Sequence, residues 1–254
     1  MLRKLAPVWL IGTLAVALRA SAAHAEAADA RALVQRVLDA APTAPFTAKG
    51  KVSSDSGERS LQLSHKRVEG VDLSYMEVTA PSDLDGTRFL LIDNLQEPDL
   101  QFIKVRGVQR AVQVSAQSRK QPFLGSEFYI SDMVRPEIDA YDYSFVGEEQ
   151  VGGRACKLVQ SVPKAPADEL YSKTIMAIDP TDLLMMRTQF FDPKGKLLKV
   201  WTLEKVEKID GAWTPLLQKM VNVQAGRDST IELSEVRYNV QLPEQVFERS
   251  YLTR

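Results

Sequence analysis

Two residue types that carry much enzyme chemistry are scarce in this chain of 254 residues, which has two histidines, His24 and His65, and one cysteine, Cys156. A histidine cluster, a zinc site of cysteines and histidines, and a disulfide framework each need more of these residues. Most hydrolase and metalloenzyme mechanisms are therefore disfavoured, and we expect no metal and no cofactor. The remaining composition, 44% apolar and 26% charged, is typical of a globular chain.

The first 25 residues have the pattern of a secretory signal peptide. Arg3 and Lys4 form a basic start, the run Leu5–Leu18 has no charge, and Ala23-His24-Ala25 matches the small-x-small site that signal peptidase cleaves. The apolar run is short for a hydrocarbon core of about 30 Å, but an uncleaved membrane anchor remains the alternative interpretation. Cleavage after Ala25 predicts an extracytoplasmic protein.

The predicted cleavage also changes the charge of the chain. It removes Arg3, Lys4 and Arg19 and no acidic residue, so the formal net charge falls from −1 to −4. A mildly acidic chain is not expected to carry the basic stripe that nucleic acids require. We therefore expect no nucleic-acid partner.

One helix followed by many strands is the pattern of the remaining chain. Asp29 is a suitable N-cap for a helix that Pro42 would end. From Phe46 onward apolar residues alternate with period 2, and turn sequences such as Asp210-Gly211 separate the runs. About eleven strands with short connections predict an antiparallel meander. The helix presents one apolar face, formed by Leu33, Val34, Val37 and Leu38.

The alternation is lost between about Gln113 and Arg135, where bulky apolar residues predict short helical turns. One face of the sheet needs a cover, and the candidates are the N-terminal helix, residues 122–134 and a C-terminal turn at Pro243–Phe247. The predicted fold class is mainly β with α: a curved antiparallel sheet, an unclosed β-barrel, wrapped around short helices. Such a sheet leaves an apolar cavity between itself and its cover.

Residues that could support catalysis have simpler structural interpretations. His65 shares a strand face with Leu61 and Leu63, which favours a hydrogen-bonded strand histidine over a general base, and no Gly-x-Ser-x-Gly motif supplies a nucleophile. Cys156 lies in an alternating strand and is interpreted as a small buried apolar residue. The carboxylate pairs lack the spacing of a calcium loop, and nothing in the sequence supports a glycosidase that uses two of them. We therefore predict no catalytic residue.

Apolar and aromatic side chains are the remaining functional signal. Each is typical of a plain core when considered singly, but methionine adapts to ligands of variable shape, and several methionines lie on neighbouring predicted strands. We expect Met186, Thr188 and Phe190 to share the inner face while Arg187 and Gln189 face water. The predicted ligand-binding residues of the cavity and its cover are Phe89, Phe102, Phe123, Phe128, Met176, Met186, Phe190 and Trp201.

Several short motifs resemble one known family. They include Leu84-Asp85-Gly86-Thr87 before a strand, Phe123-Leu124-Gly125-Ser126-Glu127-Phe128 with Asp132 after it, Asp192-Pro193-Lys194-Gly195 and Trp213-Thr214-Pro215. With these motifs the chain resembles the outer-membrane lipoprotein-sorting proteins, or LolA-like carriers, particularly a longer branch. The resemblance covers residues 26–254 as a single half-barrel domain. It implies a concave face, covered by short helices, that holds acyl chains of a lipid or lipoprotein.

The resemblance implies a periplasmic carrier that moves lipid or lipoprotein acyl chains towards the outer membrane. An inner-membrane transporter or exporter would load the cargo and an outer-membrane acceptor would receive it, with the carrier as a monomer. Burying a long chain is strongly favourable, at about 0.8 kcal/mol per CH₂ group, and needs no catalytic residue. The alternatives are an accessory binding module of an envelope exporter complex that carries nothing, and an envelope hydrolase.

Overall fold

The computed structural model describes residues 26–94, 99–115, 118, 120–165 and 170–254. The predicted signal peptide, residues 1–25, lies outside the described residues. A helix spans residues 26–39, so Asp29 lies within it and is not its N-cap as the sequence predicted. No helix within the described ranges is both long and apolar enough to span a membrane.

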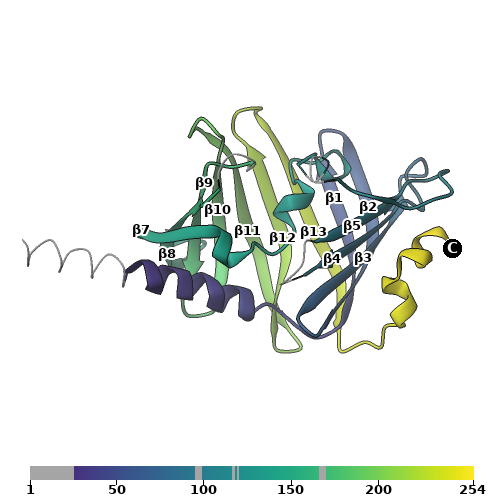
Figure 1. Ribbon diagram of the computed structural model, residues 1–254, viewed down its shortest axis with the longest axis horizontal. Coiled ribbons are helices and arrows are strands. Elements are labelled where there is room, and N and C mark those ends of the chain that lie inside the picture. The colour runs from purple at the N-terminus through teal and green to yellow at the C-terminus, as the bar shows by residue number, and fades with distance from the viewer. Residues whose placement is uncertain (1–25, 95–98, 116–117, 119, 166–169) are drawn as a thin grey trace, which may run out of the picture.

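Within the described ranges the strands form one antiparallel sheet of thirteen, with the order β6-β5-β4-β3-β2-β1-β13-β12-β11-β10-β9-β8-β7 (Figure 1). Apart from β6 and β7, which lie at opposite edges, strands that are neighbours in sequence are neighbours in the sheet, and the first and last strands pair at its centre. The strands are β1 (Phe46–Ser54), β2 (Gly57–Val68), β3 (Val71–Ala80), β4 (Arg88–Asp93), β5 (Leu100–Lys104), β6 (Val112–Gln113), β7 (Tyr141–Val151), β8 (Arg154–Pro163), β9 (Lys173–Asp179), β10 (Leu184–Phe191), β11 (Leu197–Ile209), β12 (Ala212–Asn222) and β13 (Arg227–Tyr238).

The meander follows from the local sequence. Two-residue hairpins at Gly152-Gly153 and Asp210-Gly211 have positive φ at both positions, which matches the right-handed twist of the strands they join. The fold class predicted from the sequence is confirmed, because the sheet is curved and its two edge strands, β6 and β7, do not pair with each other to close a barrel. The edge strand β6 is short, with Val112 and Gln113 paired with β5.

Three segments cover the sheet, and Figure 1 shows them on two different sides. The helix of residues 26–39 packs against β7–β9 through Ala30, Leu33 and Val34. Residues 120–140, here called the crossing segment, connect the two opposite edges of the sheet and pack against β1–β4. The short turns of the crossing segment are η1 (Phe123–Gly125), η2 (Ile130–Asp132) and η3 (Ile138–Ala140).

The C-terminal turns η5 (Glu244–Phe247) and η6 (Arg249–Thr253) pack on the outer face of the sheet. They cover Tyr75 and Leu90, whose neighbours Met76 and Leu91 point to the inner face. The sequence placed this segment among the covers of the inner face, and that prediction was wrong. The outer face of β3–β5 carries its own apolar stripe, and the C-terminal apolar residues bury it.

Candidate functional site

A cavity of about 550 Å³ lies between the inner face of the sheet, the N-terminal helix and the crossing segment. This size falls within the range of about 300–1,000 Å³ that is typical of small-molecule sites. Apolar side chains from both halves of the sheet line most of it. They include Val52 of β1 and Leu61 of β2 in one half, and Met185 of β10 and Met220 of β12 in the other. The helix contributes Val34 and Leu38.

Five of the eight predicted ligand-binding residues line this cavity. They are Phe123, Phe128, Met176, Phe190 and Trp201, and they come from the crossing segment and from β9, β10 and β11. Phe89 is buried but is not a lining residue. Its ring packs edge-on against the ring of Phe123, which lines the cavity, with 5.2 Å between the centroids. The structure thus gathers residues from distant parts of the sequence around one apolar space.

Two predicted residues are placed away from the cavity. Phe102 pairs with Leu90, and both side chains pack under the C-terminal turns on the outer face. A β-bulge at Met186 breaks the alternation of β10, so Met185 lines the cavity and Met186 packs against Cys156 and Ala177. A bulge adds one residue to a strand and shifts the side-chain alternation, which the sequence pattern did not reveal.

Gly50 gives the cavity room at the centre of the sheet. It lies on β1, where a Cβ atom would come within 2.6 Å of the Leu61 side chain and 3.7 Å of the Leu233 side chain. The backbone of Gly50 has no positive φ, so its glycine identity reflects space and not conformation. A larger side chain at this position would project into the cavity.

The Phe-Leu-Gly-Ser-Glu-Phe motif forms a closed loop within the crossing segment. The backbone N–H of Phe123 donates to the carbonyl of Phe128 over 2.7 Å, and the Ser126 hydroxyl donates to the carbonyl of Phe123 over 2.7 Å. Both phenylalanines and Ser126 are buried. The motif therefore holds two aromatic side chains against the sheet with its polar groups satisfied inside the loop.

A buried ion pair fastens the crossing segment to β11. Lys199 is fully buried, and its Nζ lies 2.6 Å from Oδ2 of Asp132, which also accepts a hydrogen bond from the backbone N–H of Tyr129. The Tyr171 hydroxyl donates to Oδ1 of Asp132 over 2.7 Å. Burial lowers the pKa of Lys199, and the nearby Asp132 carboxylate acts in the opposite direction. The lysine Nζ also lies 3.5 Å from the ring centroid of Tyr129.

Glu127 fastens the same segment to β12 and β13. Its carboxylate accepts hydrogen bonds from Asn222 over 2.8 Å and from Arg227 over 2.6 Å, and its backbone N–H donates to the hydroxyl of Ser229. Burial alone would raise the pKa of Glu127, but the bonds from Arg227 and Asn222 outweigh burial and hold the pKa below its ordinary value. Buried polar groups thus attach the cover to three neighbouring strands.

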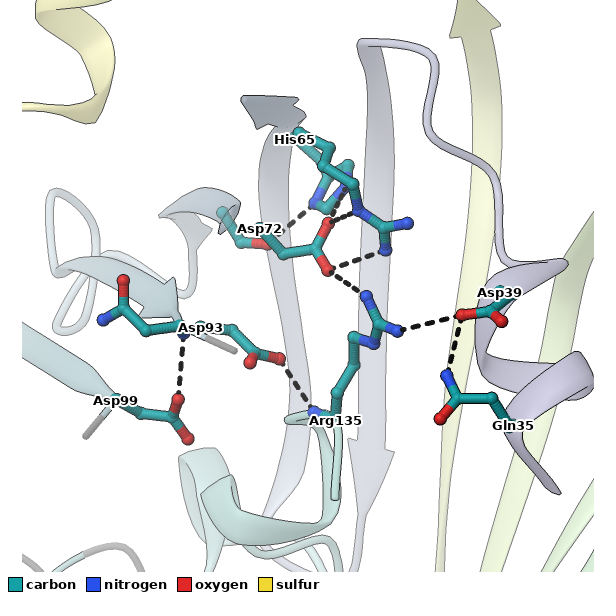
Figure 2. Close-up of polar contacts among 10 residues, drawn as sticks. Gln35, Asp39, His65, Asp72, Asp93, Asp99 and Arg135 are labelled. Atoms are coloured by element: carbon teal, nitrogen blue, oxygen red, sulfur yellow. Dashed lines mark hydrogen bonds and ion pairs between the residues drawn. The ribbon is translucent and has the colours of Figure 1, made fainter. Parts of the chain in front are cut away.

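A second charged cluster, here called the charged end, contains His65 and Arg67 of β2, Asp72 of β3 and Asp93 of β4, together with Arg135 (Figure 2). Its centre is Asp72, which accepts two hydrogen bonds of 2.7 Å from Arg67 and lies 3.4 Å from His65 Nε2. Burial alone would raise the pKa of Asp72, but the hydrogen bonds from His65 and Arg67 hold it well below its usual range. Asp72 is therefore a charged structural anchor.

Arg135 joins the charged end to the cover. Its backbone N–H donates to Asp93 over 2.8 Å, its Nη1 lies 3.4 Å from Asp72, and its Nη2 lies 4.0 Å from Asp39 on the N-terminal helix (Figure 2). Arg135 also lines the cavity. Burial raises the pKa of Asp93 to about 6, with further contributions from Asp99 and Asp72 and an opposing one from Arg135. One arginine thus contacts the sheet, the helix and the cavity.

His65 has hydrogen-bond partners on both ring nitrogens. Nδ1 lies 3.0 Å from the Ser74 hydroxyl and Nε2 lies 3.4 Å from Asp72. In the serine-protease triad the serine faces Nε2 and the aspartate faces Nδ1, and here the order is reversed. Asp72 is also neutralised by Arg67. The arrangement agrees with the interpretation of His65 as a hydrogen-bonded strand histidine.

Cys156 is 3% exposed, and burial raises the pKa of its thiol. A buried thiol with a raised pKa has little thiolate, so it is a poor nucleophile. Within the described part of the chain, no group of three or more histidine, cysteine, aspartate and glutamate side chains could hold a metal ion. The arrangement as a whole can hold an apolar ligand.

Known structures with a similar fold cover nearly the whole chain. A DUF1329 family protein from Desulfovibrio piger is 24% identical, with a TM-score of 0.82, and the match covers 89% of this chain and 99% of that one. A Vibrio parahaemolyticus domain named for outer membrane lipoprotein sorting is 23% identical, with a TM-score of 0.82 over 90% of this chain and 100% of that one. A LolA superfamily protein from Nitrosomonas europaea is 17% identical, with a TM-score of 0.67 over 87% and 98% of the two chains.

A family model described as an uncharacterized protein matches residues 70–254. The chain belongs to a LolA-like family. No curated protein matches it. The resemblance found in the sequence is therefore confirmed at the level of the family and the fold.

The polar residues that hold this LolA-like protein's cover were missed from the sequence. Lys199 lies in the same alternation phase as the inward-facing Trp201, and Asp72 lies in phase with Ser74 and Met76. A charged residue in the apolar phase of a strand was the signal that could have found them, because a buried charge requires a partner. Their partners, Asp132 and Arg135, lie far away in the sequence.

Proposed function

We propose that this LolA-like protein is a carrier that holds the acyl chains of a lipid or lipoprotein in its cavity. The observation that carries the proposal is the cavity of about 550 Å³ with its apolar lining. Each CH₂ group moved from water into such a space contributes about 0.8 kcal/mol, so an acyl chain binds with no catalytic group. The residues proposed to contact the chain are Phe123, Phe128, Met176, Phe190 and Trp201, with Phe89 supporting Phe123.

The carrier is proposed to work in the periplasm after cleavage behind Ala25, as a monomer that moves its cargo towards the outer membrane. An inner-membrane transporter or exporter would load it, and an outer-membrane acceptor would empty it. The test is purification from the native host by osmotic shock, followed by mass spectrometry of the protein and of its organic extract. We expect a chain that begins at Glu26 and a co-purified acyl lipid. A chain that retains its first 25 residues would contradict the location, and an extract without lipid would contradict the carrier.

Replacing Gly50 with leucine is expected to weaken binding of a fluorescent fatty acid by at least about tenfold, because the side chain occupies cavity space. The matched control is Lys49→Leu, which adds a leucine on the same strand at a site 57% exposed and paired with Glu235. Fluorescence titration of the purified variants measures both. Equal affinity of Gly50→Leu and the unmodified protein would contradict binding in this cavity.

One surface feature favours the second candidate, an accessory module that binds a protein partner. The loop between β5 and β6 exposes Val105 and Val108, and the first residue of β6, Val112, is exposed beside them, each between 41% and 42%. The loop also carries Arg106 and Arg110. Exposed apolar residues beside positive charge fit an acidic protein surface.

Under this second candidate, the double variant Arg106→Glu/Arg110→Glu is expected to lose a stoichiometric partner in a pull-down, while Lys205→Glu keeps it. Complementation by the cavity variant Phe190→Asp would then remain intact. Loss of complementation in Phe190→Asp, with that variant folded, would exclude the module and favour the carrier.

A further inference from the structure

The crossing segment presents two polar atoms that have no hydrogen-bond partner among the described residues. They are the hydroxyl of Ser131 and the Nε–H of Arg135, both buried, and both residues line the cavity. Buried polar groups in native proteins are almost always paired, because an unpaired donor loses its hydrogen bonds to water. Two such groups four positions apart, both on residues that line one cavity, indicate a place for an acceptor atom of a ligand.

The rest of the Arg135 side chain already has partners. Nη1 lies 3.4 Å from Asp72 and Nη2 lies 4.0 Å from Asp39, as Figure 2 shows, while the backbone N–H is bound to Asp93. The buried Nε–H of this side chain is a donor without a partner among the described residues. The Ser131 hydroxyl, which can rotate, supplies a second donor.

The charge around Arg135 argues against a negatively charged ligand group. Arg67 and Arg135 are the two guanidinium groups of the charged end, and the carboxyl groups of Asp39, Asp72 and Asp93 face them. The positive charge is therefore already balanced by neighbouring carboxyl groups. A further anion would be poorly stabilised here, whereas an uncharged oxygen would accept both hydrogen bonds without adding charge.

We propose that Ser131 and Arg135 bind the uncharged carbonyl oxygen of an acyl ester or acyl amide, with the attached chain in the apolar part of the cavity. This inference rests on the proposed carrier function and names its ligand class. An acyl ester fits a glycerolipid and an acyl amide fits an N-acylated peptide, and both present the same carbonyl acceptor. A free fatty acid, which carries a carboxylate, is the disfavoured ligand.

The test compares ligands that differ in their polar group, using displacement of a bound fluorescent acyl probe. Methyl myristate supplies the carbonyl, heptadecane has the same number of heavy atoms without an acceptor, and myristate supplies a carboxylate. Cyclodextrin delivers all three. We expect Ser131→Ala and Arg135→Lys each to lower the affinity for methyl myristate by about three- to tenfold, the usual effect of one hydrogen bond. The affinity for heptadecane should stay unchanged.

The variants are chosen so that the fold is preserved. The Ser131 hydroxyl has no partner within the described chain, and Arg135→Lys retains the positive charge and the backbone bond to Asp93. The matched control is Ser161→Ala, since this hydroxyl also lines the cavity but is bonded to Tyr143. We expect Ser161→Ala to change the affinities for methyl myristate and heptadecane by the same factor.

Each outcome separates this inference from the carrier function. If both neutral ligands bind and neither depends on Ser131 or Arg135, the carbonyl site is wrong and the carrier stands. If no acyl ligand binds, the carrier function itself fails. If myristate binds most tightly and Arg135→Lys weakens it most, the site recognises an anion and the inference is overturned.

Two further probes identify the source of the carbonyl. They are 1-myristoylglycerol, an ester, and N-myristoylglycinamide, an amide. A loss of affinity in Ser131→Ala for one of them supports the inference and assigns the ester or the amide class. No loss for either would overturn it.

Discussion

Replacing Lys199 with methionine is expected to destabilise the folded protein by about 3–5 kcal/mol, the usual cost of removing one partner of a buried ion pair. Asp132, with a side chain only 3% exposed, would be left without its cation beneath the cover. Urea unfolding at neutral pH measures the change through the transition midpoint. A large loss would identify the buried pair as a main attachment of the crossing segment.

Two further variants make this prediction specific. The double variant Lys199→Met/Asp132→Asn removes both charges. The asparagine oxygen can still accept from the backbone N–H of Tyr129, and its amide N–H can donate to the Tyr171 hydroxyl oxygen, so the double variant should recover at least half of the lost stability. The control is Lys205→Met on the same strand, whose pair with Glu207 is more than half exposed. This control should change stability by less than about 1 kcal/mol. A double variant as unstable as Lys199→Met would show that lost packing, and not the unpaired charge, is responsible.

Replacing Asp93 with asparagine is expected to stabilise the protein by about 3 kcal/mol near pH 7.5 and to have little effect near pH 4. The pKa of Asp93 is about 6 in the folded protein, against an ordinary value of 3.8, because burial disfavours the charged carboxylate. This difference corresponds to about 3 kcal/mol. Asparagine is uncharged and still offers an oxygen to the backbone N–H of Arg135.

The sign of the pH effect follows from the raised pKa. The folded state holds the Asp93 proton more tightly than the unfolded chain does. The stability that Asp93 contributes to the fold is therefore fully present below about pH 3.8 and is lost as the pH rises through about 6. Urea midpoints of the two proteins between pH 4 and 7.5 test this. Asp72→Asn is the control of opposite sign, because the lowered pKa of Asp72 stabilises the fold at neutral pH. Parallel profiles for Asp93→Asn and the unmodified protein would contradict the prediction.

The local sequence predicted most of the architecture because the features that define it are local. Alternating apolar residues specify the strands, two-residue turns such as Asp210-Gly211 specify the hairpins, and loss of alternation after Gln113 marks the cover. The helix face of Leu33 and Val34 packs as expected. These signals act over a few residues, so no knowledge of the tertiary structure is needed to recognise them.

The features that the sequence did not reveal depend on tertiary structure. The bulge at Met186 is set by the pairing of β9 with β10, and Phe102 faces outward because the C-terminal turns cover that side. The pairs Lys199–Asp132 and Arg135–Asp72 join residues that come together only after the crossing segment spans the sheet. A cavity lining can therefore be predicted as a class of residue more readily than as a set of positions.

The central pairing of β1 with β13 has a consequence for folding. Phe46 pairs with Tyr238, so β1, the first strand in sequence, cannot complete its pairing until β13, the last strand, has formed. Contacts between such distant residues slow folding, since the intervening chain must be ordered before they form. Until β13 arrives, β1 and β12 each present an open edge that can pair with another chain. Loss of the last strand would therefore expose two aggregation-prone edges at the centre of the sheet.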